Sequence, residues 1–264
     1  MQYKRVISFG DSFTWGSELS DEVCVPPLEV YQNPDKYPRE YQILVDRKIA
    51  MFSETTIDHK TRSITAGYSN LTWPALLAKD IDAEYYCHAW PGSGNQSIVR
   101  NIMKIIKQIK ATDLIVINWT YISRWDFYDA TSPQLQRRWK TVRPGGETDA
   151  FSEVYFKYIQ SEFWDKWETL RNILTVTCLL KNKNIDFIMT CLDPLVFDKQ
   201  HHIETYVLNA QEEIKDDIVW FNGKGFYDWA VEHGFPIGKE NGHPLEEAHQ
   251  AAFEYIRDNY DFTK

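Results

Sequence analysis

Short apolar runs alternate with amphipathic helical patterns along this chain, and this alternation constrains its fold most strongly. Four runs are predicted to form strands, at residues 6–9, 84–87, 114–118 and 185–191. Strands separated by helices pair in parallel through right-handed crossovers, and a parallel sheet is covered by helices on both faces. We therefore expect an α/β fold, with a three-layer α/β/α sandwich.

Three helical patterns lie between and after the strands. Isoleucines from Ile98 to Ile109 follow the spacing of one buried helix face, and a longer apolar stripe runs from Phe163 to Cys178. A last helix is predicted to begin at Pro244, because proline is favoured in the first turn. His249 falls on the buried stripe of that helix, so we interpret it as a structural histidine.

Two polar stretches, at about 20–70 and 119–150, interrupt this rhythm. Each begins just after the carboxyl end of a predicted strand, the edge where open α/β sheets bind ligands. They are predicted to form walls or a lid over a site, the alternative being ordinary packed insertions. At 264 residues, the chain is predicted to form one domain over 1–264 that carries both insertions.

Charge and composition exclude several classes of partner. The 29 basic and 38 acidic residues give a net charge of −9, which disfavours nucleic acid and anionic membranes. No segment reaches the roughly 18 apolar residues of a membrane span, and the N-terminus lacks a signal-peptide pattern. The cysteines show no metal-ligand spacing and are predicted to be free thiols: Cys24, Cys87, Cys178 and Cys191. We expect a cytoplasmic protein without metal or cofactor.

The segment VISFGDSFTWG, from Val6 to Gly16, places Ser12 just beyond the first predicted strand. Gly-Asp-Ser is a good turn or helix-cap sequence, because Asp and Ser bond nearby backbone N–H groups. The alternative interpretation is a nucleophile at the carboxyl end of a central strand. An activated serine needs a base, a group that orients the base, and donors for an oxyanion.

Candidates for the base and its orienting group lie in GKENGHPLEEAHQ. His243 directly precedes Pro244, so it is expected on a loop tip beyond the core. Glu240, three residues earlier, is predicted to orient the imidazole, with Asn241 as a neutral alternative. The alternative interpretation of Glu240 is an exposed loop charge.

Candidates for the oxyanion donors lie in HAWPGSGNQSI and LIVINWTYISR. Gly92 lets the backbone approach a ligand closely and offers its N–H without a side chain in the way. A plain strand-to-helix turn, with Asn95 or Ser97 near the cap, is the alternative interpretation. The second donor is predicted to be a polar residue after the third strand.

These blocks together resemble the SGNH, or GDSL-type, hydrolases. SFGDSFTWG resembles the family's first block, TWPALLAKDIDAEYYCHAWPGSGN the stretch leading to its second, and ENGHPLEEAHQAAFEYI its last. The resemblance implies a flavodoxin-like parallel sheet of about five strands. It also implies Ser12 as nucleophile, His243 as base, and an oxyanion hole formed by the N–H groups of Ser12 and Gly92.

The sequence departs from that family at two places. Its third block has a Gly-x-Asn pattern, whereas NWT places Asn118 at the glycine and Thr120 at the asparagine. Asn118 from a shifted position, or Asn95, is therefore predicted to complete the oxyanion hole. The last block normally has Asp three residues before the histidine, and Glu240 occupies that place here.

The segment WTYISRWDFYD adds an aromatic cluster after the third strand. Its rings are expected to form either a platform for a sugar or acyl chain, or core beneath the insertion. Arg124 is expected to pair with Asp126 or Asp129, the alternative being a clamp for a substrate anion. The predicted substrate-binding residues are Asp11, Asn95, Thr120, Trp119 and Arg124.

The predicted function is hydrolysis of a small acyl ester through an acyl-enzyme on Ser12. An O-acetylated carbohydrate is the candidate substrate. Two alternatives stay open: a carbohydrate-binding module that lost efficient chemistry, and an acyltransferase that uses the same serine. Neither nucleic acid nor a membrane is an expected partner, and the oligomeric state is left open.

Overall fold

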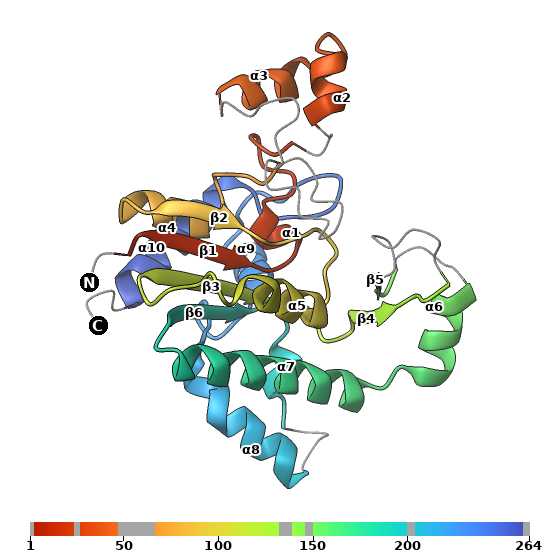
Figure 1. Cartoon of the computed structure of the whole chain (residues 1–264). Helices are drawn as coiled ribbons and strands as arrows, with labels where there is room; N and C mark the ends of the chain where they lie inside the picture. The colour runs from red at the N-terminus through yellow and green to blue at the C-terminus, as the bar shows by residue number, and fades with distance from the viewer. Residues whose placement is uncertain are drawn as a thin grey trace.

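The computed structural model describes residues 3–23, 27–46, 67–131, 139–145, 150–199 and 204–260. Its centre is a five-stranded sheet in which every pairing is parallel (Figure 1). In spatial order the strands are β2 (Glu84–Cys87), β1 (Arg5–Phe9), β3 (Asp113–Trp119), β6 (Asp186–Cys191) and β7 (Ile218–Val219). This is the flavodoxin-like order, with the first strand inside the sheet and the second at its edge. The predicted fold class is confirmed.

All four predicted strands are present, and their ends differ from the prediction by no more than one residue. The sequence did not locate β7, because its two residues are too few to show a hydrophobic pattern. Its existence depends on pairing with Met189 and Thr190 of β6.

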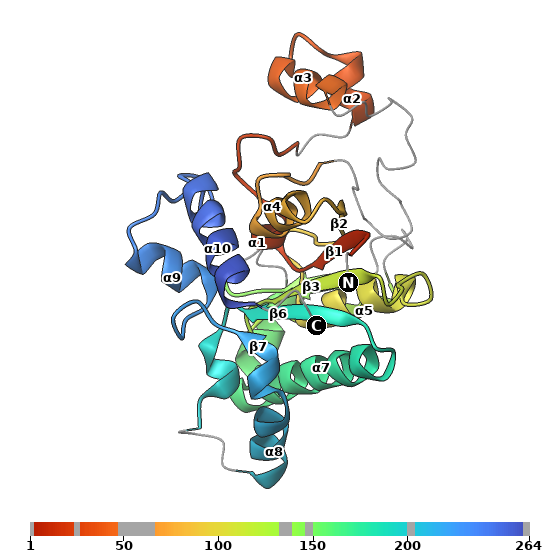
Figure 2. The same cartoon turned by 90° about the vertical axis from the view of Figure 1, so that its left-hand side faces the viewer.

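The sheet separates two hydrophobic cores, because alternate residues of a strand point to opposite faces. In β3, Ile115 and Ile117 join one core, whereas Leu114 and Val116 join the other. Helices α5 (Asn95–Ile105), α7 (Glu162–Asn182) and α8 (Thr205–Ile214) cover the first face, and α4 (Trp73–Asp80), α9 (Phe226–Glu232) and α10 (Glu246–Asn259) cover the second. Figure 2 shows α9 and α10 on one side of the sheet and α5 and α7 on the other.

Two details of the predicted helices are wrong. Cys178 is exposed, because the fully buried stripe of α7 passes instead through Ile173, Val176 and Leu180. The last helix begins at Glu246, since Pro244 pairs with Ile237 in an isolated bridge before it.

The described part of the first insertion contains α2 (Pro27–Gln32) and α3 (Pro38–Asp46), which lie apart from the sheet in both views. They share a small cluster of their own around Val23, Val30 and Leu44. Residues 24–26 and 47–66 of this insertion lie outside the described residues.

The second insertion contains regular structure that the sequence pattern does not predict. Strands β4 (Trp125–Tyr128) and β5 (Trp139–Val142) pair antiparallel, and α6 (Ala150–Val154) continues into a π-helical turn, η2 (Tyr155–Ile159). Stacked aromatic rings connect these elements: Trp125 lies 4.6 Å from Tyr155, and Phe127 lies 4.2 Å from Phe151, between ring centroids. This aromatic cluster therefore serves at least partly as the core of the insertion.

Three of the four cysteines, Cys87, Cys178 and Cys191, are free, as predicted, and Cys24 lies outside the described residues. Within the described ranges, no helix has the length and apolar character that crossing a membrane requires. The same ranges contain no group of three or more His, Cys, Asp or Glu side chains placed to hold a metal ion.

His249 has the structural role predicted for it. The ring is buried in α10, and its Nδ1 accepts the backbone N–H of Trp73, the first residue of α4, at 3.2 Å. The imidazole therefore satisfies an N–H that no residue of α4 itself can accept. Burial lowers the pKa of His249 to about 3 from its ordinary value of 6.5, so the ring is neutral at pH 7.

This histidine is expected to make the fold sensitive to acid. Between pH 6.5 and about 3 the unfolded chain binds a proton at His249 that the folded protein excludes. The free energy of unfolding therefore decreases as the pH is lowered across that window. By pH 5 this linkage should cost about 2 kcal/mol. Urea unfolding at pH 7 and pH 5 measures the loss, which should be smaller by about that amount in His249→Gln. Equal losses in the two proteins would contradict the assignment.

Candidate active site

Ser12 opens the short helix α1 (Ser12–Trp15) at the carboxyl end of β1. The cap of this helix is Asp11, whose Oδ1 accepts the backbone N–H of Phe13 at 3.1 Å. The Ser12 side chain is therefore not needed for the turn, and its hydroxyl makes no hydrogen bond with any described residue. Ser12 as a whole is 6% exposed. In this segment Asp11 caps the helix, and the Ser12 hydroxyl is left without a hydrogen-bond partner among the described residues.

His243 approaches this turn from the far end of the chain. Its ring lies 5.0 Å from the ring of Phe13, the residue after Ser12, between centroids. Its Nδ1 lies 2.8 Å from Oε2 of Glu18, and both side chains are 12% exposed. No hydrogen bond joins His243 to Ser12 within the described contacts. Such bonds are often long in unliganded enzymes and tighten when substrate binds.

Glu18 is held by several backbone donors. Its Oε2 also accepts the N–H of His243 at 3.0 Å, and its Oε1 accepts the N–H of Glu240 at 2.9 Å. The Glu18 backbone is left-handed, with φ of 69°, and its own N–H donates to Glu22 at 2.8 Å. A side chain at Gly238 would collide with the Glu18 carboxyl group, so glycine permits this close approach.

These donors keep Glu18 ionised. Burial opposes its ionisation, but the hydrogen bonds from the backbone and ring of His243, and from the N–H groups of Asn241 and Glu240, outweigh burial. Together they lower the pKa of Glu18 from 4.5 to about 2. Because an ionised carboxylate can only accept, Nδ1 of His243 must carry a proton, and in the neutral imidazole Nε2 is then the nitrogen that can accept one.

The prediction that Glu240 orients the imidazole is wrong. The carboxylate against Nδ1 belongs to Glu18, and Glu240 contributes its backbone N–H to that same carboxylate. The helix α1 ends at Trp15 with Gly16 as its left-handed cap, and the chain then turns so that Glu18 meets the loop before α10. No local spacing indicates this contact, because it depends on how the chain turns after α1 and brings Glu18, six positions beyond Ser12, to a distant loop.

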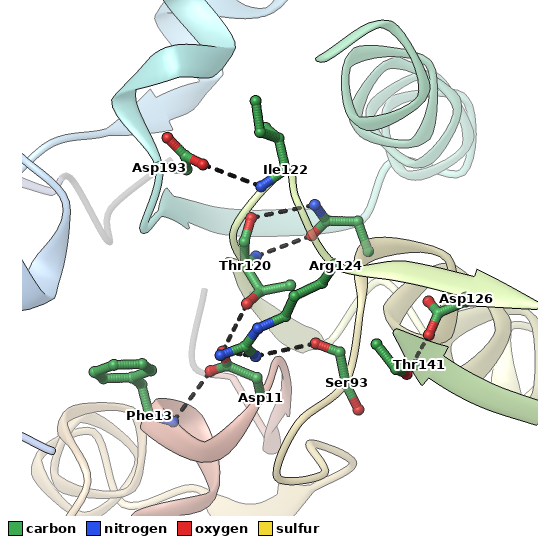
Figure 3. Close-up of polar contacts among 10 residues, drawn as sticks. Asp11, Phe13, Ser93, Thr120, Ile122, Arg124, Asp126, Thr141 and Asp193 are labelled. Carbon is green, nitrogen blue, oxygen red and sulfur yellow. Dashed lines mark hydrogen bonds and ion pairs between the residues drawn. The ribbon is translucent and has the colours of Figure 1, made fainter. Parts of the chain in front are cut away.

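A second charged group, Asp11, directly precedes Ser12 in the chain, and Figure 3 shows its contacts with Thr120 and Arg124. Asp11 is fully buried, and its Oδ2 accepts the Thr120 hydroxyl at 2.7 Å and Nη1 of Arg124 at 2.6 Å. The expected pairing of Arg124 with Asp126 or Asp129 is wrong.

Asp126 and Asp129 are engaged elsewhere. Asp126 accepts the backbone N–H and the hydroxyl of Ser97, at 2.7 and 2.9 Å, and thereby caps α5. Asp129 pairs with Lys140 across the β4–β5 hairpin at 2.8 Å. Arg124 is therefore left to reach the segment that carries Ser12.

Three predicted substrate contacts are buried and engaged within the protein, so that prediction is wrong for them. Asn95 bonds the backbone of Thr120 in both directions, with Oδ1 accepting at 2.9 Å and Nδ2 donating at 3.1 Å. The Thr120 hydroxyl donates to Asp11. Trp119 is fully buried in the core, where its indole N–H donates to Met189. Asp11 likewise positions other groups from a fully buried place.

The predicted backbone donors lie on neighbouring loops. Gly92 has a φ of 78°, in the region that glycine favours, and the N–H of Trp90 donates to the carbonyl of Gly10 at 3.2 Å. This bond ties the glycine loop to the end of β1. The N–H groups of Ser12 and Gly92 donate to no other group in the described part of the chain. Asn118, whose Oδ1 accepts the Thr190 hydroxyl at 2.8 Å, stays a predicted donor.

Removing the Glu18 carboxylate should loosen the loop that carries His243. In Glu18→Ala, the N–H groups of Glu240 and His243 lose a charged acceptor, so their exchange with deuterium should be about ten to a hundred times faster. Amide hydrogen exchange of the 238–243 segment measures this. Glu240→Ala is the matched control, because it retains both the backbone N–H and the Glu18 acceptor. Unchanged protection in Glu18→Ala would contradict the inferred role.

No protein-family model and no curated protein matches this chain. Among solved structures it is similar to a member of the lipolytic protein G-D-S-L family from Veillonella parvula DSM 2008, with 11% identity and a TM-score of 0.44, over 97% of this chain and 98% of that chain. It is similar to the acetyl xylan esterase Est2A from the rumen bacterium Butyrivibrio proteoclasticus, with 12% identity and a TM-score of 0.45, over 98% of this chain and 64% of that chain. At these values neither likeness assigns a role to a residue of this chain.

Proposed function

We propose that this protein is a serine hydrolase that cleaves a small acyl ester. Ser12 Oγ attacks the acyl carbon while Nε2 of His243 takes the hydroxyl proton, giving a tetrahedral intermediate. His243 then protonates the leaving alkoxide, and the acyl group stays on Ser12. Water attacks this ester, again giving its proton to His243, and the acid is released while the proton returns to Ser12.

The observation that carries the proposal is the pairing of His243 with Glu18 beside the turn of Ser12. The 2.8 Å contact at Nδ1 sets the tautomer that a general base needs, and the adjacent carboxylate stabilises the imidazolium that forms. The N–H groups of Ser12 and Gly92 are the proposed donors for the oxyanion.

The surroundings of Ser12 support a small acyl group on a ring-shaped alcohol. With only 6% of Ser12 exposed, a compact acyl group such as acetyl fits the approach better than a long chain. Trp90, Tyr121 and Tyr227 lie half-buried near this turn, and Tyr227 contacts the Phe13 ring at 6.0 Å. Such rings stack on the apolar faces of sugars. We therefore propose an O-acetylated carbohydrate as the substrate class.

A carbohydrate-binding module is the second candidate. The observation that favours it is the lack of a hydrogen bond between His243 and Ser12 among the described contacts.

An acyltransferase would use the same acyl-enzyme, with a sugar hydroxyl in place of water as acceptor. Product analysis with and without added sugar separates the transferase from the hydrolase.

Labelling by a fluorophosphonate tests the nucleophile. The phosphorus should attach to Ser12 in the wild type, because the probe needs an activated hydroxyl, and labelling should disappear in Ser12→Ala. In His243→Ala it should be slower by about a thousandfold or more. Intact-protein mass spectrometry measures the adduct, and peptide mapping locates it. Well-folded wild-type protein that remains unlabelled would favour the binding module.

The two glutamates near His243 should differ sharply in their effect on rate. Glu18→Gln removes the charge that orients and stabilises the imidazole, so kcat/KM for an acetyl ester should fall by about 10²–10⁴. Glu240→Gln keeps the backbone N–H that bonds Glu18 and should remain within about threefold of the wild type. The reverse order of effects would restore Glu240 as the orienting acid.

A further inference from the structure

We infer that Arg124 supplies the third donor of the oxyanion hole. This inference rests on the proposed hydrolysis at Ser12 and concerns how its tetrahedral intermediate is stabilised. Neither Thr120 nor Asn95 is free to serve, because the single hydroxyl proton of Thr120 goes to Asp11, and the amide of Asn95 bonds Thr120 and Thr169. A donor other than these two is needed beside Ser12.

The anchoring of Arg124 places its guanidinium between the two loops that carry the backbone donors. Nη1 donates to Oδ2 of Asp11 at 2.6 Å and to the carbonyl of Ser93 at 3.2 Å (Figure 3). Asp11 directly precedes Ser12, and Ser93 directly follows Gly92. The guanidinium therefore bridges the neighbours of both proposed N–H donors.

Most of the guanidinium remains available to a ligand. It carries five N–H donors, and the two bonds to Asp11 and Ser93 both come from Nη1. The guanidinium makes no other hydrogen bond among the described residues, and the Arg124 side chain is 12% exposed. The group is thus fixed at one end by a buried carboxylate and open at the other.

The charges also suit an oxyanion. Asp11 balances the charge of Arg124 in the free protein, so the pair is neutral as a whole in its partly buried place. When negative charge develops on the carbonyl oxygen, a charged N–H donor stabilises it more strongly than a neutral amide. The Tyr121 ring, 5.3 Å from the guanidinium carbon, holds the group from another side.

The rival explanation for a partly exposed arginine is recognition of an acidic group on the substrate. The two roles differ in their kinetics. A donor to the oxyanion acts in the transition state on every ester, so its loss lowers kcat. A residue that recognises an anion mainly affects KM, and only for substrates that carry the anion.

The test uses Arg124→Gln and Arg124→Ala with two acetyl esters, one neutral and one carrying a carboxylate. We expect kcat to fall by about 10²–10³ for both esters, with little change in KM. Added guanidinium ion should partly restore kcat in Arg124→Ala, which shows that the site has kept its shape. Lys140→Gln is the matched control, since it removes a positive charge from the same insertion at a side chain that is 43% exposed. It should remain within about twofold.

Three results would overturn the inference. In the first, Arg124→Gln keeps kcat within about threefold of the wild type while Ser12→Ala is inactive. The proposed hydrolysis at Ser12 would then be supported, and Arg124 would not be a donor to the oxyanion. A rise in KM confined to the acidic ester would assign Arg124 to anion recognition. A loss of kcat in Asn118→Ala without one in Arg124→Gln would make Asn118 the third donor. If the wild type shows no turnover that depends on Ser12, the proposed function fails and this inference fails with it.

Discussion

The contact between the Glu18 carboxylate and the His243 imidazole joins segments separated by 225 residues. It places a proton on Nδ1 of the ring, and the same carboxylate fixes the backbone of the loop that carries the ring. A charged group on the turn after α1 therefore organises a loop near the end of the chain. Without it, no other group in the described part of the chain would select, at Nδ1, the tautomer in which Nε2 can accept a proton.

The short segment from Asp11 to Glu18 has two carboxylates, one on each side of Ser12. Asp11 pairs with Arg124 from the second insertion, and Glu18 pairs with His243 from the loop before α10. Removing a carboxylate from water costs free energy unless charged or hydrogen-bonding partners replace the water. The charge partners Arg124 and His243 meet this requirement, and both therefore lie at the same edge of the sheet as Ser12. The proposed nucleophile thus lies between two charge pairs that fix the loops around it.

The second insertion illustrates the limit of local pattern. Trp119 ends β3 and Thr120 follows it; the sequence predicts that both face a substrate, yet both are buried and help to hold the strand end and Asp11 in place. Trp125 and Phe127, in contrast, stack within a small antiparallel unit. An aromatic residue in a polar stretch fits a ligand platform and a local core equally well. Only the neighbouring elements decide between the two.

By itself, the sequence determined four of the five strands of the sheet and placed Ser12 and His243 on loops beside it. Apolar runs, helical spacing and the loop positions beside Gly10 and Pro244 are local signals, because each arises from residues that are neighbours in sequence. The tertiary structure alone decided that Glu18, and not Glu240, faces the imidazole, and that Arg124 pairs with Asp11. Those pairings depend on how distant loops meet at the sheet edge, where desolvation and hydrogen-bond geometry select one partner among several acidic residues of similar spacing.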